Sequence, residues 1–121
     1  MVLFDKTALP SSLGTSENDV LIQFYEMFIQ ITLESWNDLS VSNKSNDFKL
    51  VRQTAHKLKS SSASVGALAL ADSLKSLEMA AADGNLLRVI EQTEQTTQLL
   101  HSTIDLVRAE LTSLQQEPMR A

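Results

Sequence analysis

A histidine stands in the most basic part of an otherwise acidic chain. The net charge is −5, yet the segment from Lys44 to Lys59 contains five basic residues and one acidic residue, and His56 lies within it. A neutral imidazole is a good nucleophile near pH 7, and nearby cations offset the negative charge of a phosphoryl group. These residue types indicate phosphoryl transfer to His56. Charge and periodicity alone leave an ordinary exposed histidine on a basic helix face as the alternative.

The spacing around His56 places it on the solvent side of a helix. At about 100° per residue, His56 lies roughly 130° from the centre of the apolar stripe of its segment. Small side chains near the ring let a partner approach in line with the reacting bond. We therefore expect an exposed ring and, around it, a docking surface that consists of Arg52, Gln53, Lys57, Ser60 and Ala63.

Glu78 is the acidic residue that chain geometry brings level with His56. An antiparallel hairpin turning at Gly66 places residues about ten positions before the turn beside those about ten positions after it. The Glu78 carboxylate would then hold one imidazole nitrogen and present the other, which fixes the tautomer. An ordinary surface glutamate paired with Lys75 is the alternative.

The second histidine, His101, provides a control within the same chain. It lies at the margin of an apolar stripe, and Asp105 follows one helical turn later. It lacks the basic surroundings of His56. We interpret it as a boundary histidine with a carboxylate neighbour.

Four predicted helices behind an N-terminal arm position these residues. They run from Asn18 or Asp19 to about Leu39, from about Asp47 to Val65, from about Ala67 to Ala82, and from the turn at Asp83-Gly84-Asn85 to about Leu114. Short connections favour antiparallel neighbours, so the predicted fold is all-α, an antiparallel up-down-up-down four-helix bundle with a short N-terminal arm or helix. A single domain spans residues 1–121, with the arm at 1–17, the bundle at 18–114 and a polar tail at 115–121.

The first and last of these helices have distinctive apolar patterns. The last carries one long stripe, whereas the first carries two stripes and must be covered on two sides. We expect the N-terminal arm to cover the second of these, and any uncovered remainder would be a partner-docking surface. The two stripes of the first helix are Leu21, Phe24, Phe28, Ile31, Ser35 and Ile22, Tyr25, Ile29, Leu33, Trp36, and the stripe of the last is Leu86, Val89, Thr93, Thr97, Leu100, Ile104, Val107, Leu111, Leu114.

Composition excludes several classes of protein. Hydrophobic residues make up 43%, aromatic residues 5%, and there are only three glycines and two prolines, which favours helices over sheets. The absence of cysteine rules out disulfides and thiolate metal sites. We find no signal peptide, membrane span or ATP-binding glycine motif, so we expect a cytoplasmic protein without its own kinase activity or cofactor. The negative net charge argues against nucleic-acid binding.

One continuous motif resembles the signature of the histidine-containing phosphotransfer (HPt) domain family. It consists of Ala55-His56-Lys57-Leu58-Lys59-Ser60-Ser61-Ser62, followed by Gly66-Ala67 and Leu77-Glu78. The resemblance covers nearly the whole chain, from about Phe4 to Leu114. One departure is Ser60, because the family usually has glycine at that position.

The resemblance implies a phosphorelay intermediate. His56 would accept a phosphoryl group from the aspartyl phosphate of one receiver domain and donate it to the aspartate of another, and Lys59 would be the phosphate-facing cation. The implied partners are response-regulator receiver domains and a hybrid sensor histidine kinase, and Mg²⁺ would be bound by the receiver. The simplest expectation for the chain itself is a monomer.

Three other kinds of helical protein remain as alternatives. The dimerisation domain of a histidine kinase normally has an acidic residue after its histidine, whereas Lys57 stands here. The phosphoacceptor domain of a chemotaxis-type histidine kinase shares the His-x-x-Lys arrangement. A non-catalytic helical adaptor would need no reactive histidine, so phosphorylation of His56 would exclude it.

Overall fold

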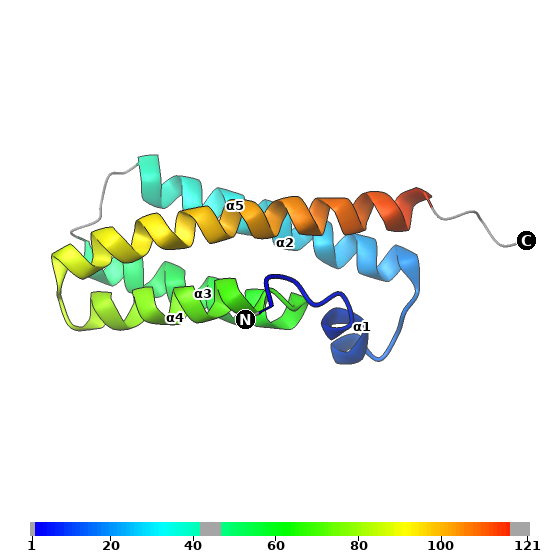
Figure 1. Cartoon of the computed structure of the whole chain (residues 1–121), viewed down its shortest axis with the longest axis horizontal. Coiled ribbons are helices and arrows are strands. Elements are labelled where there is room, and N and C mark those ends of the chain that lie inside the picture. The colour runs from blue at the N-terminus through cyan, green and yellow to red at the C-terminus, as the bar shows by residue number, and fades with distance from the viewer. Residues whose placement is uncertain (1, 42–46, 117–121) are drawn as a thin grey trace, which may run out of the picture.

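The protein is a bundle of four long helices with one short helix at an end (Figure 1). The computed structural model describes residues 2–41 and 47–116, and all regular secondary structure in these ranges is helical. This confirms the predicted all-α fold. None of the described helices is long and apolar enough to cross a membrane. The helices are α1 (Ala8–Leu13), α2 (Asn18–Val41), α3 (Phe48–Val65), α4 (Leu68–Ala82) and α5 (Leu86–Gln116).

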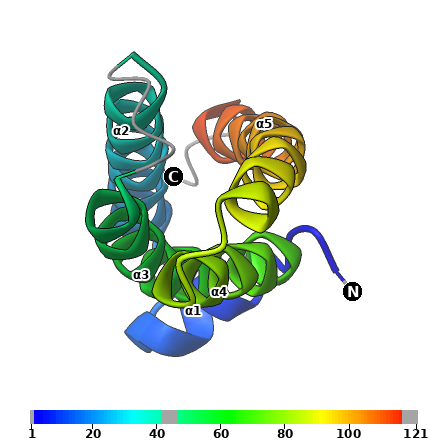
Figure 2. The same ribbon diagram turned by 90° about the vertical axis from the view of Figure 1, so that its left-hand side faces the viewer.

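The long helices occupy the corners of a bundle in which neighbours in sequence are neighbours in space (Figure 2). Helix α2 packs on α3 and α5, and α4 packs on the same two helices from the other side. The α3–α4 pair has the most extensive contact, because small buried residues such as Ala55, Ala80 and Ala81 allow close approach. The result is the predicted up-down-up-down arrangement.

Local signals account for the ends of α3. The Asp47 side chain accepts a hydrogen bond from the Leu50 amide at 3.0 Å and caps the first turn. At the other end Gly66 has a φ of 89°, the left-handed conformation that ends a helix and favours glycine. The predicted bounds of α3 and α4 are therefore correct to within a residue. Helix α2 runs slightly past Leu39 and α5 past Leu114, while residues 42–46 of the predicted loop and 117–121 of the predicted tail lie outside the described residues.

The N-terminal arm lies against the turn between α3 and α4. The Asp5 amide donates to the Gly66 carbonyl at 2.8 Å, and the Ala69 amide donates to the Val2 carbonyl at 3.1 Å. The Phe4 ring packs edge-on against Tyr25 of α2 at 5.8 Å between centroids. The arm thus ties this end of the bundle together and contains α1, the short helix that the sequence allows.

The two apolar stripes of α2 are used differently from the prediction. The buried residues follow a line between the two stripes, and Thr32 and Leu39 among them belong to neither stripe. The buried residues of α2 are Leu21, Tyr25, Phe28, Thr32, Trp36 and Leu39. The second stripe is covered mainly by the bundle, where Trp36 Nε1 donates to Thr97 Oγ1 of α5 at 3.0 Å. The expectation that the arm covers this stripe is therefore wrong except at Tyr25. Part of the first stripe is left exposed instead, at Phe24 and Ile31, with Met27 beside them.

Helix α5 also departs from its predicted stripe. Thr96 and Thr103 are buried, whereas Leu86 is exposed, and Thr93 and Thr97 are only partly buried. The Thr96 hydroxyl lies 2.6 Å from that of Ser73 on α4, so a polar contact replaces apolar packing at this level. A buried hydroxyl with a partner costs little, which makes Thr96 compatible with the core. The buried Thr103 hydroxyl has no hydrogen-bond partner among the described residues.

Candidate functional site

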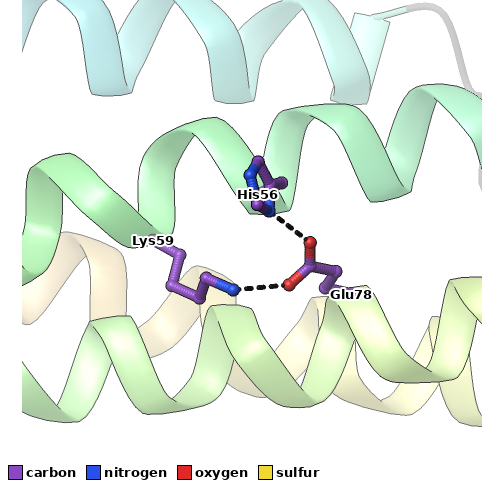
Figure 3. A network of polar contacts seen from close by, with 3 residues as sticks. All are labelled: His56, Lys59 and Glu78. Carbon is purple, nitrogen blue, oxygen red and sulfur yellow. Dashed lines mark hydrogen bonds and ion pairs between the residues drawn. The ribbon is translucent and has the colours of Figure 1, made fainter.

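Three polar side chains from α3 and α4 converge on one face of the bundle (Figure 3). His56 Nδ1 lies 2.6 Å from Glu78 Oε2, and Lys59 Nζ lies 2.7 Å from Glu78 Oε1. The side chain of His56 is 68% exposed, compared with 19% for Glu78 and 29% for Lys59. The structure therefore brings together the three residues selected from the sequence, with the histidine outermost.

The contact with Glu78 decides which imidazole nitrogen is available. An ionised carboxylate can only accept hydrogen bonds, so Nδ1 of a neutral His56 carries the proton and donates a hydrogen bond to Glu78. The other nitrogen, Nε2, then keeps its lone pair. Because the ring is exposed, this nucleophilic nitrogen can be reached from solvent.

Glu78 stays ionised because of the cation beside it. The hydrogen bond from Lys59 is the largest influence and lowers the pKa of Glu78 below its ordinary value of 4.5. Partial burial of the carboxylate opposes this shift, and the hydrogen bond with His56 adds to it. Glu78 is paired with Lys59 and His56, and not with Lys75, so the alternative of an unrelated surface ion pair does not describe it.

The predicted docking residues are all exposed along α3, on the turns around His56. Lys57 points toward α2, where its Nζ donates to Ser35 Oγ at 3.1 Å. The Ser60 carbonyl accepts a hydrogen bond from Ser64 Oγ at 3.0 Å, and its own side chain faces solvent. The surface contains Arg52, Gln53, Lys57, Ser60 and Ala63.

An apolar groove follows the α2 side of this surface. It has a volume of about 310 Å³ and lies between α1, α2 and the last turns of α3. Phe24, Met27 and Ile31 of α2 form one wall, and Ser61 and Ser64 of α3 form part of another. The sequence indicated an uncovered remainder on this helix, but it did not show that Met27 belongs to it, because Met27 lies in neither predicted stripe.

The surroundings of His101 are different. It is exposed on α5, as is Asp105, and within the described residues it makes no hydrogen bond or ion pair. Its predicted position at the margin of the core is therefore wrong. Within residues 2–41 and 47–116, no group of three or more His, Asp or Glu side chains lies close enough together to hold a metal ion.

Two comparisons with known proteins find a match to this chain. The family model of the Hpt domain matches residues 23–117. The crystal structure of histidine-containing phosphotransfer protein B (HptB) from Pseudomonas aeruginosa PAO1 is similar, with a TM-score of 0.80 and 26% sequence identity over 92% of this chain and 96% of that one. Among curated protein sequences, no match is found. The family model spans most of the chain, and we conclude that this protein belongs to the Hpt domain family, whose members are phosphotransfer intermediates and not kinases.

Proposed function

We propose that this chain is a phosphorelay intermediate in which His56 accepts a phosphoryl group from a receiver-domain aspartyl phosphate and donates it to the aspartate of another receiver. The observation that carries the proposal is the 2.6 Å contact of Nδ1 with Glu78, which leaves Nε2 of an exposed ring as the nucleophile. Membership of the Hpt family supports histidine phosphotransfer in a phosphorelay. Hpt domains interact with receiver domains and kinases of two-component systems.

The transfer step follows from this arrangement. The Nε2 lone pair forms the bond to phosphorus while the bond from phosphorus to the aspartate oxygen breaks, and the carboxylate leaves with the electron pair. Positive charge develops on the imidazole as the new bond forms. Glu78 stabilises that charge through its hydrogen bond to Nδ1, in the same way that a buried aspartate supports the histidine of a catalytic triad. The reverse sequence transfers the group to the next receiver.

Lys59 has two anionic groups within reach in the phosphorylated state. Lys59 lies one helical turn after His56 on α3, and in the structure its ammonium pairs with Glu78 of α4. We expect it to be shared with the phosphoryl oxygens once His56 is charged, because an ammonium has three donors and a phosphoryl group is a strong acceptor. Lys59 would thereby stabilise the phosphohistidine while it still keeps Glu78 in place.

Docking of a receiver would use the small residues beside the ring and the apolar groove. Ser60 and Ala63 are exposed and leave His56 open to in-line approach. Serine at position 60 replaces the family's usual glycine, yet its side chain faces solvent and remains small. The groove lined by Phe24, Met27 and Ile31 offers exposed apolar area for a partner's apolar surface.

The remaining chemistry would belong to the partners. We expect the receiver to hold the Mg²⁺ that receiver phosphorylation requires, and a hybrid sensor histidine kinase to supply the phosphoryl group through its receiver. We expect the chain to act in the cytoplasm as a monomer and to bind no cofactor.

A direct labelling experiment tests the proposal. The chain is incubated with purified receiver domains charged with acetyl phosphate and Mg²⁺, and the labelled residue is mapped by its acid-labile, base-stable phosphate. The His56→Gln variant should accept nothing, while His101→Gln should accept at the normal rate, because both side chains are exposed and only His56 contacts Glu78. Normal charging of His56→Gln together with loss in His101→Gln would contradict the assignment. Absence of histidine phosphate from every receiver would favour a structural adaptor.

A further inference from the structure

A second groove lies on the α4 side of His56, opposite the apolar groove. Its volume is about 360 Å³. On α3, Lys49 and Arg52 precede His56 by two turns and one turn, which places the groove about 6 to 10 Å from the ring along the helix axis. On α4, Ala81 and Ala82 are small and leave the groove open. Its complete lining is Phe48, Lys49, Arg52, Gln53, Ala81 and Ala82.

The two cations of this groove have no counter-charge in the described part of the chain. Lys49 and Arg52 are exposed, and neither makes an ion pair with a described carboxylate. The other basic residues of α3 are engaged, since Lys59 pairs with Glu78 and Lys57 donates to Ser35. Helix α3 itself contains no acidic residue. An acidic chain therefore keeps a positive groove next to its reactive histidine.

Nearby negative charge does not neutralise the groove. Asp83 follows Ala82 at the end of α4, but its carboxylate lies 3.6 Å from Arg88 of α5. Glu78, one turn before Ala82, is held by Lys59 and His56. Asp47, just before α3, accepts a hydrogen bond from the Leu50 amide and makes no ion pair with either cation. None of these three carboxylates pairs with Lys49 or Arg52, so the charge of both cations is available to a binding partner.

We propose that this groove binds an acidic segment on the surface of the partner receiver domain, beside its phosphorylated aspartate. The inference rests on the proposed function and names the chemistry of that partner. Charge complementarity of this kind accelerates association and fixes the orientation of the two proteins. The receiver that fits presents carboxylates toward the start of α3.

The two grooves together define an orientation. Ser64 in the apolar groove and Lys49 in the positive groove lie on either side of His56, about 22 Å apart along α3. A receiver held at both grooves has one orientation over Nε2, with an apolar patch toward the end of α3 and acidic residues toward its beginning. Receivers that lack the acidic segment are disfavoured, which makes Lys49 and Arg52 determinants of specificity.

Charge reversal with a matched control tests this inference. The variant Lys49→Glu/Arg52→Glu is compared with Lys6→Glu/Arg108→Glu, which changes the net charge equally at exposed residues that line neither groove. The assay measures the second-order rate constant for transfer from the receiver that charges the wild-type chain fastest. At about 0.05 M salt the groove variant should be slower by roughly tenfold or more, and the difference should shrink near 1 M salt, where the Debye length is about 3 Å.

A second pair of variants approaches the groove from α4 and leaves both cations in place. Ala82 is exposed at the end of α4, so Ala82→Glu adds a carboxylate to the groove without changing the core. Ala82→Gln adds nearly the same volume without charge. The glutamate variant should be slower than the glutamine variant at low salt and equal to it at high salt. Reversing the receiver's acidic segment to lysine should restore transfer to Lys49→Glu/Arg52→Glu.

Each outcome distinguishes this inference from the proposed function. Wild-type rates in the groove variant, an equal loss in the control, or a loss unchanged at high salt would overturn the inference. Phosphorylation by phosphoramidate tests whether His56 is still reactive in each variant. If Lys49→Glu/Arg52→Glu is not phosphorylated by phosphoramidate, the comparison of Ala82→Glu with Ala82→Gln tests the inference instead. Failure of the proposed function would look different, because the wild-type chain itself would then acquire no phosphate on His56 from any receiver.

Discussion

Replacing Gly66 with alanine should weaken the junction of α3, α4 and the N-terminal arm. Gly66 is buried and has a φ of 89°, where L-residues other than glycine are strained. A Cβ at this position would lie 2.1 Å from the backbone oxygen of Asp5 and 3.0 Å from the Cβ of Ala8. Because the first of these atoms belongs to the backbone, a side-chain rotation cannot relieve the clash, and the arm must move.

A second glycine, Gly14, allows the destabilisation caused by Gly66→Ala to be estimated. Gly14 also has a positive φ, 69°, but a Cβ there would meet no atom within 4 Å. Gly14→Ala should therefore cost only the left-handed strain, about 1 to 2 kcal/mol. Gly66→Ala bears the same strain and also displaces the arm. The displacement breaks the 2.8 Å hydrogen bond from the Asp5 amide, which lowers the free energy of unfolding by about 1 kcal/mol more, and it also disturbs local packing.

Urea unfolding followed by helical circular dichroism measures this difference. We expect the free energy of unfolding of Gly66→Ala to be lower than that of Gly14→Ala by at least about 1 kcal/mol, or about 4 °C in melting temperature. Both variants share the same gain from reduced freedom of the unfolded chain, so that contribution cancels. An equal loss of unfolding free energy in the two variants would contradict this prediction, because it would show that displacing the arm does not destabilise the protein.

The other predictions concern the reactive face. Lys59→Ala should slow acceptance or shorten the lifetime of the phosphohistidine at low salt without unfolding α3, and no change in either quantity would remove Lys59 from the mechanism. Ser60→Gln or Ala63→Gln should leave melting unchanged yet reduce transfer from a receiver by on the order of a hundredfold, while phosphorylation by phosphoramidate persists; normal receiver transfer would place docking elsewhere. Because the pKa of Glu78 is lowered from 4.5, its carboxylate stabilises the fold above that pH, and the contribution is lost as the pH falls through the lowered value. The stability difference between the wild-type chain and Glu78→Gln should therefore shrink as the pH falls below 4.5, and a difference that stays constant on acidification would contradict this prediction.

The parts of the fold that the sequence predicts well are those set by local signals. Helix α3 begins after the Asp47 cap and ends at Gly66 because both residues act on their own neighbouring backbone. Its single apolar stripe allows only one face to be buried, so the exposure of His56 follows directly. The position of Glu78 beside His56 follows from the number of residues that separate each of them from the Gly66 turn, which can be counted in the sequence.

Helix α2 shows where such reasoning ends. Its two stripes leave a narrow polar strip, so several rotations about its axis would bury a similar apolar area. The choice between them depends on contacts made far along the chain, such as Trp36 with Thr97. Lys59 illustrates the same limit at the site: its spacing from His56 is local, but its pairing with Glu78 is decided across two helices.

Helices α3 and α4 connect the Gly66 turn to the contact between His56 and Glu78. Glu78 reaches His56 only because α3 and α4 are held in register, both by their extensive packing and by the Gly66 turn, about 15 Å along the axis from the ring. A misplacement of about 1 Å at a reacting group can cost on the order of a hundredfold in rate. A shift of the turn would therefore lengthen the bond from Nδ1 to Glu78 while His56 stayed exposed and chemically intact. Under the proposed function, a displaced arm would therefore slow phosphotransfer through the position of Glu78, although the arm makes none of the contacts among His56, Lys59 and Glu78.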